Sequence, residues 1–405
     1  MRWLFCEPGS PDEKHKTQVA SHIMPWWREF TAKVPQVIAS FKQEAKFDLP
    51  GWMHETLGKI DPRLMWEYGP AIKGEGHRLV ITPEMHRELR PLTSTILKNA
   101  PQLPGWEFYP YRLPESLEMA QITVEARTNG SLQGVTFRPA IGEGRRIDLT
   151  FFSPRTKNEE DQQSLHDAFV ATETLLGEEF LDKWIGSISV APVPKAGLLG
   201  SLFGGAKASA GKQLPLERLR DTVTALSQSV VEQLPPVGFA QRHDDAGWAN
   251  YQMDPEQAED YLFREDVIVG STMEPDLLAA MLPGGGFFSG RFSRVNERFC
   301  YVKIDSSEIP IEQRVEARGE LEEALHEALM AANSGAQIGG AVGLRYVYID
   351  LALTNVQAGL QIIRKLCHGR VSRRSWAFFC DADYIGEWIG LYSDSPPPPL
   401  PNFDE

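Results

Sequence analysis

The most constraining feature of this sequence is the stretch 335–369, where a strand-like pattern runs directly into a helix-like one. Apolar residues at every second position predict a strand with one buried face: Val347, Ile349, Leu351 and Leu353. Beyond a suitable N-cap, Thr354, apolar residues recur at steps of four, three and four until Gly369: Val356, Leu360, Ile363 and Cys367. Upstream, Gly339, Gly340 and Gly343 predict a hairpin turn with positive φ. The stretch therefore predicts strand, turn, strand and helix.

The elements around this stretch extend it to the order βαββαβ. The predicted strands and helices lie at 299–305, 311–333, 335–353, 355–366 and 375–380. The same order can be written for 106–190, beginning with a strand at Trp106. We therefore expect an α+β fold with two ferredoxin-like βαββαβ units, each an antiparallel sheet with helices on one face. The segments RPAIGEGRRIDLTFF and IGGAVGLRYVYIDLAL share a glycine turn, an arginine and Ile-Asp-Leu, so an internal duplication and chance are both open explanations.

Composition shifts predict five ranges along the chain. Residues 1–63 form an N-terminal helical segment, in which Pro35 is expected to separate two helices. Residues 64–194 and 214–394 are the first and second α+β domains, joined by a linker, 195–213, rich in glycine, alanine and serine. Residues 395–405 are a proline-rich tail that favours polyproline II.

Charge and cysteine usage exclude several classes of protein. The 405-residue chain has a formal charge of −14 and no cluster of basic residues, which argues against a nucleic-acid partner. It has no signal-like N-terminus and no apolar run long enough to span a membrane, so we expect a cytoplasmic protein without a membrane partner. The four cysteines show neither a disulfide framework nor zinc-site spacing. No cofactor is indicated.

Acidic residues near the predicted sheet suggest one kind of chemistry. Asp305 ends a predicted strand, but the hairpin IGGAVG carries no carboxylate, which argues against two-metal catalysis on this sheet. Asp350, Asp381 and Asp383 remain candidates for Mg²⁺ ligands. A solvated turn at DADYIGEW is the favoured explanation for the last two. No catalytic residue is assigned.

Two further groups are candidates for binding. His243, followed by Asp244 and Asp245, fits a ligand cluster or a catalytic base with its orienting carboxylate, but an ordinary polar turn is the default explanation. Arg345 and Asp305 are both expected near the hairpin end, where they can pair as a salt bridge. If Arg345 faces outward beside Tyr346, it can instead recognise a carboxylate or a protein partner.

Several motifs together resemble a bacterial family of uncharacterised proteins, classed as a domain of unknown function. They are LVITPE at 79–84, LRPLT at 89–93, PGWEFYPYR at 104–112 and GLRYVYIDLAL at 343–353. The resemblance covers most of both halves and implies a bacterial, cytoplasmic α+β protein without transferable catalytic residues. The βαββαβ order is also similar to ferredoxin-like regulatory domains, including acidic proteins that bind and restrain enzymes, although fold alone does not fix function.

Two functional hypotheses follow. The first is a non-enzymatic binding or regulatory protein that acts through protein contacts, suggested by the missing catalytic constellation, the acidic charge and the polyproline tail. The second is an enzyme with a site in the cleft between the two α+β halves, for which dependence on carboxylates and a metal ion is an open alternative. The sequence leaves the oligomeric state open.

Overall fold

The computed structural model describes residues 2–194, 212–243, 247–255, 263–281 and 286–399. Its fold is mixed α/β with several antiparallel strand pairings. The chain divides into two compact units, of which the first combines Met1–Pro110 with Pro235–Glu405 and the second is Tyr111–Leu234. These units divide the chain differently from the predicted ranges, because residues 64–194 contribute to both. Most of the predicted linker, up to residue 211, lies outside the described residues, as do Leu400–Glu405 of the tail.

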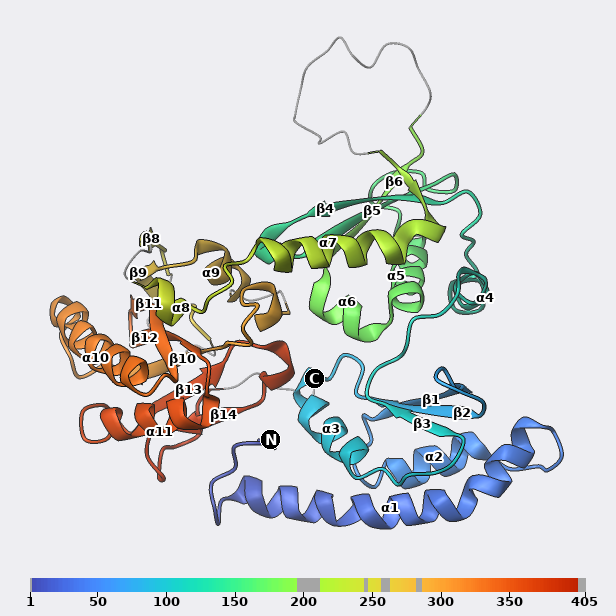
Figure 1. The fold of residues 1–405 in the computed structure, drawn as a ribbon, viewed down its shortest axis with the longest axis horizontal. Helices are drawn as coiled ribbons and strands as arrows, with labels where there is room; N and C mark the ends of the chain where they lie inside the picture. The colour runs from blue at the N-terminus through green and yellow to red at the C-terminus, as the bar shows by residue number, and fades with distance from the viewer. Residues whose placement is uncertain (1, 195–211, 244–246, 256–262, 282–285, 400–405) are drawn as a thin grey trace, which may run out of the picture. The chain divides into compact units, whose positions relative to one another are not determined.

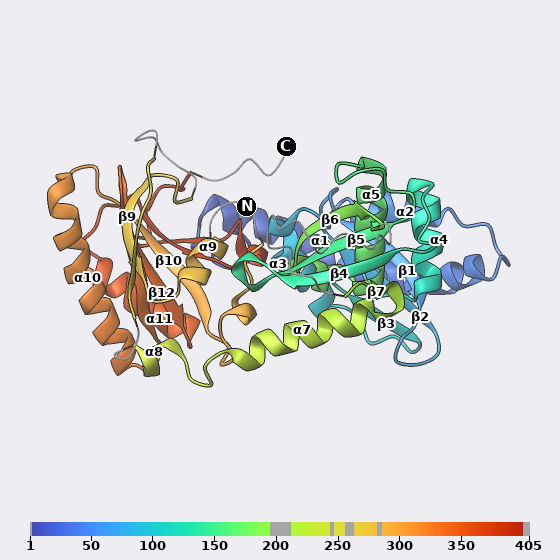
Figure 2. The same ribbon diagram turned by 90° about the horizontal axis from the view of Figure 1, so that it is seen from above.

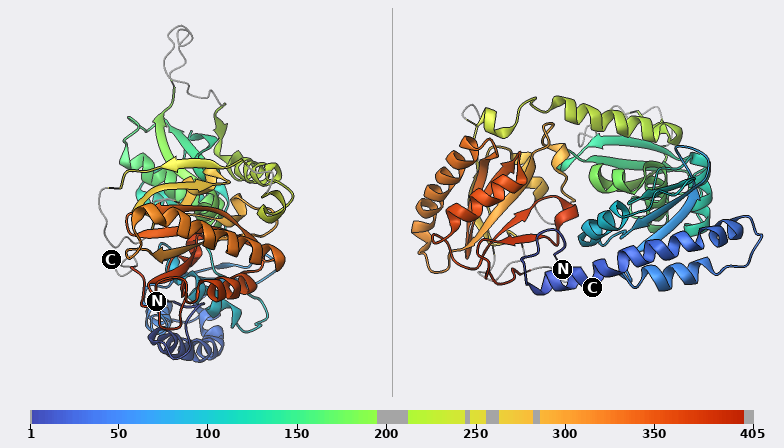
Figure 3. Two further views of the ribbon diagram at one scale, coloured as in Figure 1. Left: turned by 90° about the vertical axis from the view of Figure 1, so that its left-hand side faces the viewer. Right: turned by 60° about the horizontal axis from the view of Figure 1, so that its bottom comes forward.

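The N-terminal part of the first unit packs helices against a small sheet (Figures 1 and 3). Its elements are α1 (Pro11–Phe41), α2 (Leu49–Leu57), α3 (Arg90–Lys98), β1 (Met65–Pro70), β2 (His77–Thr82) and β3 (Trp106–Tyr109), with strand order β1-β2-β3. The predicted break at Pro35 is wrong, since α1 runs continuously through Pro25 and Pro35. Trp27, Phe30 and Val37 anchor this helix in one apolar core, and that packing outweighs the helix-breaking tendency of proline.

The C-terminal part of the first unit is built on a seven-stranded sheet of order β14-β13-β10-β12-β11-β9-β8, in which every neighbouring pair is antiparallel. Its strands are β8 (Ala249–Gln252), β9 (Val267–Thr272), β10 (Arg298–Asp305), β11 (Gly335–Gly343), β12 (Tyr346–Leu353), β13 (Ser375–Phe379) and β14 (Trp388–Gly390). Its helices are α8 (Phe239–Arg242), α9 (Pro275–Met281), α10 (Ile311–Ala331) and α11 (Val356–Cys367). The predicted strand at 347–353 and the helix after it are confirmed as β12 and α11.

Helices α10 and α11 cover one face of this sheet (Figures 1 and 2). The alternating apolar residues of β10 and β12, among them Val302 and Ile349, meet Leu325 of α10 and Ile363 of α11 in a shared core. The period-two pattern of the strands and the three-to-four-residue period of the helices place these side chains on facing surfaces. The face that the sequence marked as apolar is therefore the face that carries the helices.

The predicted glycine turn is wrong. Gly339, Gly340 and Gly343 lie inside strand β11 without positive φ, and the chain turns at Leu344 and Arg345. Glycine occupies these positions because neighbouring atoms leave no space for a side chain. A Cβ atom would meet the carboxylate of Asp350 at Gly339, that of Glu322 at Gly340 and that of Asp266 at Gly343. The glycines thus make room for buried acidic side chains on both faces of the sheet.

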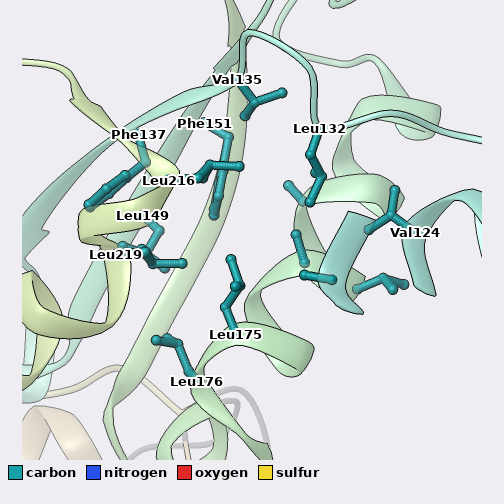
Figure 4. Close-up of a cluster of buried hydrophobic side chains, with 14 of the residues drawn as sticks. Val124, Leu132, Val135, Phe137, Leu149, Phe151, Leu175, Leu176, Leu216 and Leu219 are labelled. Carbon is teal, nitrogen blue, oxygen red and sulfur yellow. The ribbon is translucent and has the colours of Figure 1, made fainter. Parts of the chain in front are cut away.

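The second unit has its own four-stranded sheet, of order β6-β5-β4-β7. Its elements are α4 (Leu117–Thr128), β4 (Thr136–Ile141), β5 (Ile147–Ser153), α5 (Gln162–Leu176), α6 (Glu178–Trp184), β6 (Ile185–Pro192), β7 (Leu214–Pro215) and α7 (Leu219–Gln233). Side chains from the sheet, α4, α5 and α7 form one apolar core, which includes Val124, Phe137, Phe151, Leu175 and Leu219 (Figure 4).

This arrangement corrects the prediction for the first α+β domain. The strand at Trp106 is β3 of the other sheet, so it does not complete a βαββαβ series with β4, β5 and β6. The sheets are also not wholly antiparallel, because β2 pairs parallel with β3 and β5 pairs parallel with β6. Helices connect the two strands of each of these pairs, and such a crossover returns the chain in its original direction. Among the described residues, no helix is both long and apolar enough to cross a membrane.

Candidate functional site

The face of the seven-stranded sheet opposite α10 and α11 carries buried charged and aromatic side chains. Along β10, Tyr301, Lys303 and Asp305 alternate with the apolar residues that face the helices. We call the following set the ionic–aromatic face: Tyr301, Lys303, Asp305, Tyr346, Tyr348, Asp350, Trp376, and Arg264 and Asp266 from the segment before β9. Lys303 and Trp376 are both 0% exposed, although one side chain ends in an amino group and the other is an indole. Such a face needs specific polar partners to be stable.

Arg264 and Asp350 form the central ion pair. The two side chains meet through two hydrogen bonds, Nη1 to Oδ1 at 2.6 Å and Nη2 to Oδ2 at 3.2 Å, and each is only 4% exposed. The guanidinium also lies over the rings of Tyr301 and Tyr348, at 5.4 Å and 5.0 Å from their centroids. Burial alone would lower the pKa of Arg264, but Asp350 raises it above its ordinary value. The ion pair therefore fixes the direction of both side chains.

Asp266 fixes the turn between β11 and β12. Its carboxylate accepts backbone N–H groups from Arg345 and Tyr346, each at 2.9 Å, and the hydroxyl of Tyr348. Burial, reinforced by the charge of Asp266, raises the pKa of Tyr348 well above its ordinary value, so the phenol stays protonated and donates. This carboxylate acts as a structural acceptor that orients Arg345.

Asp305 joins two arginines at the edge of the face. It accepts from Arg345 Nη2 at 3.0 Å, from Arg374 Nε at 3.1 Å and from the backbone N–H of Ser307 at 3.0 Å. Burial pushes the pKa of Asp305 upward, but the hydrogen bonds from Ser307 and Arg345 outweigh it and the net pKa is lowered. The side chains of Arg345 and Arg374 remain 28% and 35% exposed. The arginine side chains thus form a partly accessible edge of an otherwise buried network.

A second polar group lies on the helix-covered side of the sheet. Glu322 of α10 sits over Gly340, and Arg318 Nε approaches its carboxylate at 3.2 Å. Burial, with a smaller contribution from the charge of Asp350, raises the pKa of Glu322 to about 7 despite the opposing effect of Arg318. One turn further along α10, the ring of His326 lies 3.9 Å from that of His243. Glu322 is therefore an acidic group in the first unit that titrates near neutral pH.

The structure brings some of the predicted residues together and separates others. Asp305, Arg345 and Tyr346 are neighbours, as expected, with the Arg345 guanidinium 5.5 Å from the Tyr346 ring centroid. Asp350 lies on the same face but is paired with Arg264. His243 packs against His326, whereas Asp244 and Asp245 lie outside the described residues.

The predicted carboxylate trio is not assembled. Asp381 accepts the backbone N–H and the hydroxyl of Ser289, and Asp350 is committed to Arg264. Asp383 follows in a short 3-10 turn, Ala382–Tyr384. Across the described ranges, no three His, Cys, Asp or Glu side chains are placed to hold a metal ion. The alternative explanation, a solvated turn, does not hold for Asp381, because its side chain is only 5% exposed and contacts Ser289 and Arg298.

Several residues of the face were missed at the sequence level. Lys303 could have been found, because it interrupts the apolar strand FCYVKID at a position that shares a face with Tyr301 and Asp305. Trp376 likewise alternates with Ala377 in a predicted strand. Arg264 and Asp266 carried no signal, since they lie 86 and 79 residues from Asp350 and Arg345, their respective partners.

Comparison with protein-family models, with curated proteins and with solved structures finds no match to this chain.

Proposed function

We propose that this protein is a non-enzymatic binding protein that acts through protein contacts at the arginine edge of the ionic–aromatic face. The observation that carries the proposal is that every carboxylate of the face is already engaged. Asp350 pairs with Arg264, Asp305 with Arg345 and Arg374, and Asp266 accepts backbone N–H groups. General acid–base catalysis needs a group that exchanges protons near the working pH, and the lowered pKa of Asp305 keeps that group ionised.

The accessible groups suit recognition. Arg345 and Arg374 present partly exposed guanidinium groups, which can bind carboxylates or main-chain carbonyl groups without losing their partner Asp305. Asp266 and Asp305 hold Arg345 from its backbone and from its side chain, so little side-chain freedom is left to lose on binding. A preorganised arginine beside aromatic rings is typical of the residues that dominate protein interfaces.

We also infer that the central part of this sheet is a ferredoxin-like unit. The support is the strand order β13-β10-β12-β11, in which all neighbours are antiparallel, with α10 between β10 and β11 and α11 between β12 and β13. This is the βαββαβ order that the sequence predicts for the second domain, extended by β14 on one side and by β9 and β8 on the other. The enzyme hypothesis now lacks the carboxylate trio that would have served a metal ion.

Peptide display tests the proposed function. The immobilised full chain, Arg345→Ala and Arg28→Ala are each screened against a library of random peptides, and enriched peptides are remeasured by titration. Arg28 is an exposed arginine of α1 and serves as the matched control. We expect the wild type and Arg28→Ala to bind the same peptides, and Arg345→Ala to bind them about tenfold more weakly, as for loss of one charged hydrogen-bonding pair. The proposal is refuted if no peptide is enriched by the wild type or by a chain with Pro396–Pro399 replaced by Gly-Ser-Gly-Ser.

A further inference from the structure

We propose that the ionic–aromatic face binds proline-rich polypeptide segments at Trp376, and that Pro396–Pro399 of the same chain occupies this site in cis. The inference rests on the proposed function, because it names the class of partner for the same face. It also assigns a role to the proline run 396–399, which lies outside the helices and strands of the fold.

The proline run is bound to the sheet through its backbone. Trp376 Nε1 donates a hydrogen bond of 2.6 Å to the carbonyl oxygen of Pro396. The Trp376 side chain is 0% exposed, and Pro398, two residues further along the run, is buried as well. The run of four prolines thus accepts a hydrogen bond from a buried indole and buries one of its own rings. These are the contacts of a bound ligand.

The preceding residues deliver the run to this site. The Ser395 hydroxyl accepts the backbone N–H of Tyr392 at 3.1 Å and closes a tight turn after β14. Gly390 provides the space, because a Cβ atom there would meet the Ser395 side chain. An ion pair between Arg373 and Asp394 lies beside the turn. Specific contacts therefore order the segment that leads to Trp376.

The chemistry of the site matches proline-rich segments in particular. Consecutive prolines have fixed φ, offer carbonyl acceptors and lack N–H groups, so they bind aromatic surfaces that supply a donor at little entropic cost. Trp376 supplies that donor, with the ring of Tyr346 at 6.3 Å and the guanidinium of Arg374 at 5.7 Å from its ring centroid. A tethered ligand acts at high effective concentration, so the chain's own run blocks proline-rich partners until it is displaced.

The test compares three versions of the full chain by anisotropy of a labelled peptide with the sequence of residues 393–405. They are the wild type, a chain with Pro396–Pro399 replaced by Gly-Ser-Gly-Ser, and that chain with Trp376→Phe added. We expect the tail-replaced chain to bind at least tenfold more tightly than the wild type. Adding Trp376→Phe, which keeps an aromatic ring but removes the N–H donor, should weaken binding about fivefold. A peptide with all prolines changed to alanine is the control ligand and should not bind.

A second readout follows the site directly and does not depend on affinity. Labelling with ¹⁵N-tryptophan gives one indole N–H signal for each of the ten tryptophans, and Trp376→Phe identifies the signal of Trp376. That signal should move when the prolines are replaced and return toward its original position when peptide is added. Equal peptide binding by wild type and tail-replaced chains, or an unmoved Trp376 signal, overturns the inference. If display enriches peptides that lack proline and none that contain it, the inference fails while the proposed function stands.

Discussion

Replacing Glu322 by glutamine is expected to stabilise the first unit at pH 8 and to have little effect at pH 5. The folded protein raises the pKa of Glu322 from 4.5 to about 7, mainly because the carboxylate is buried over Gly340. For an acid with a raised pKa, the unfolded chain ionises first, so stability falls as pH rises from 4.5 and the full cost is reached above pH 7. Glutamine removes this cost because it never ionises.

The size of the effect follows from the shift. A rise from 4.5 to about 7, at about 1.4 kcal/mol for each pKa unit, gives an upper limit of about 3 kcal/mol at pH 8. The variant also loses the attraction between Glu322 and Arg318, whose side chains are 15% and 11% exposed, and this reduces the gain. We therefore expect glutamine to raise the free energy of unfolding by about 1 to 3 kcal/mol at pH 8. Below pH 5 the two proteins should converge.

Tryptophan fluorescence during urea unfolding measures this difference in the free energy of unfolding of the first unit. Nine of the ten tryptophans belong to the first unit, and Trp184→Phe in both proteins removes the signal of the second. Glu323→Gln, at the exposed neighbouring position on α10, is the matched control and should give no pH-dependent change. A difference between Glu322→Gln and wild type that stays constant from pH 5 to pH 8 refutes the reasoning, because burial of a charge would then not be its source.

Three further substitutions, the first with a matched control, test the packing of the first unit. Gly340→Ala should destabilise the first unit by about 2 to 4 kcal/mol in chemical unfolding, because the new Cβ meets the Glu322 carboxylate and the Tyr348 carbonyl. The control, Gly319→Ala, lies in open space on α10 and should stabilise the unit by up to about 1 kcal/mol. The same sign for both would count against the spatial role of the β11 glycines. Arg264→Ala should cost about 3 to 5 kcal/mol by leaving Asp350 buried without its partner, and a loss below about 1 kcal/mol would mean that water replaces the guanidinium. Glu387→Ala should destabilise the first unit by about 2 kcal/mol, because the Glu387 carboxylate accepts the backbone N–H groups of Trp3, Leu4 and Phe5. Amide exchange at these three residues should become faster. Unchanged exchange would show that other acceptors protect these N–H groups.

Local pattern was sufficient where one face of an element is apolar and its neighbours in sequence are its neighbours in space. Strand β12 and helix α11 follow from period two and from steps of three and four residues, and both are confirmed. The hairpin of β11 and β12 was also predictable, because the two strands are adjacent in the chain. The pairing of Arg345 with Asp305 followed from the same strand order.

The prediction failed where a residue's role depends on distant parts of the chain. Glycine in a sequence indicates either a turn or a lack of space, and at Gly340 only the position of Glu322 on α10 distinguishes the two. The sequence pattern of the strand at Trp106 is compatible with the sheet of either unit. Its parallel pairing with β2, through the α3 crossover, assigns it to the first unit. Arg264 has no local pattern at all, since its partner is 86 residues away.

The sequence by itself therefore determined strands β10, β12 and β13, helices α10 and α11 and the face on which these helices lie, because periodicity records which side of an element avoids water. The tertiary structure alone decided which strands extend that sheet to seven, why β11 is rich in glycine and which charges meet on the ionic–aromatic face. Those outcomes depend on the space and the partners that remote segments provide, and periodicity within one element carries no record of either.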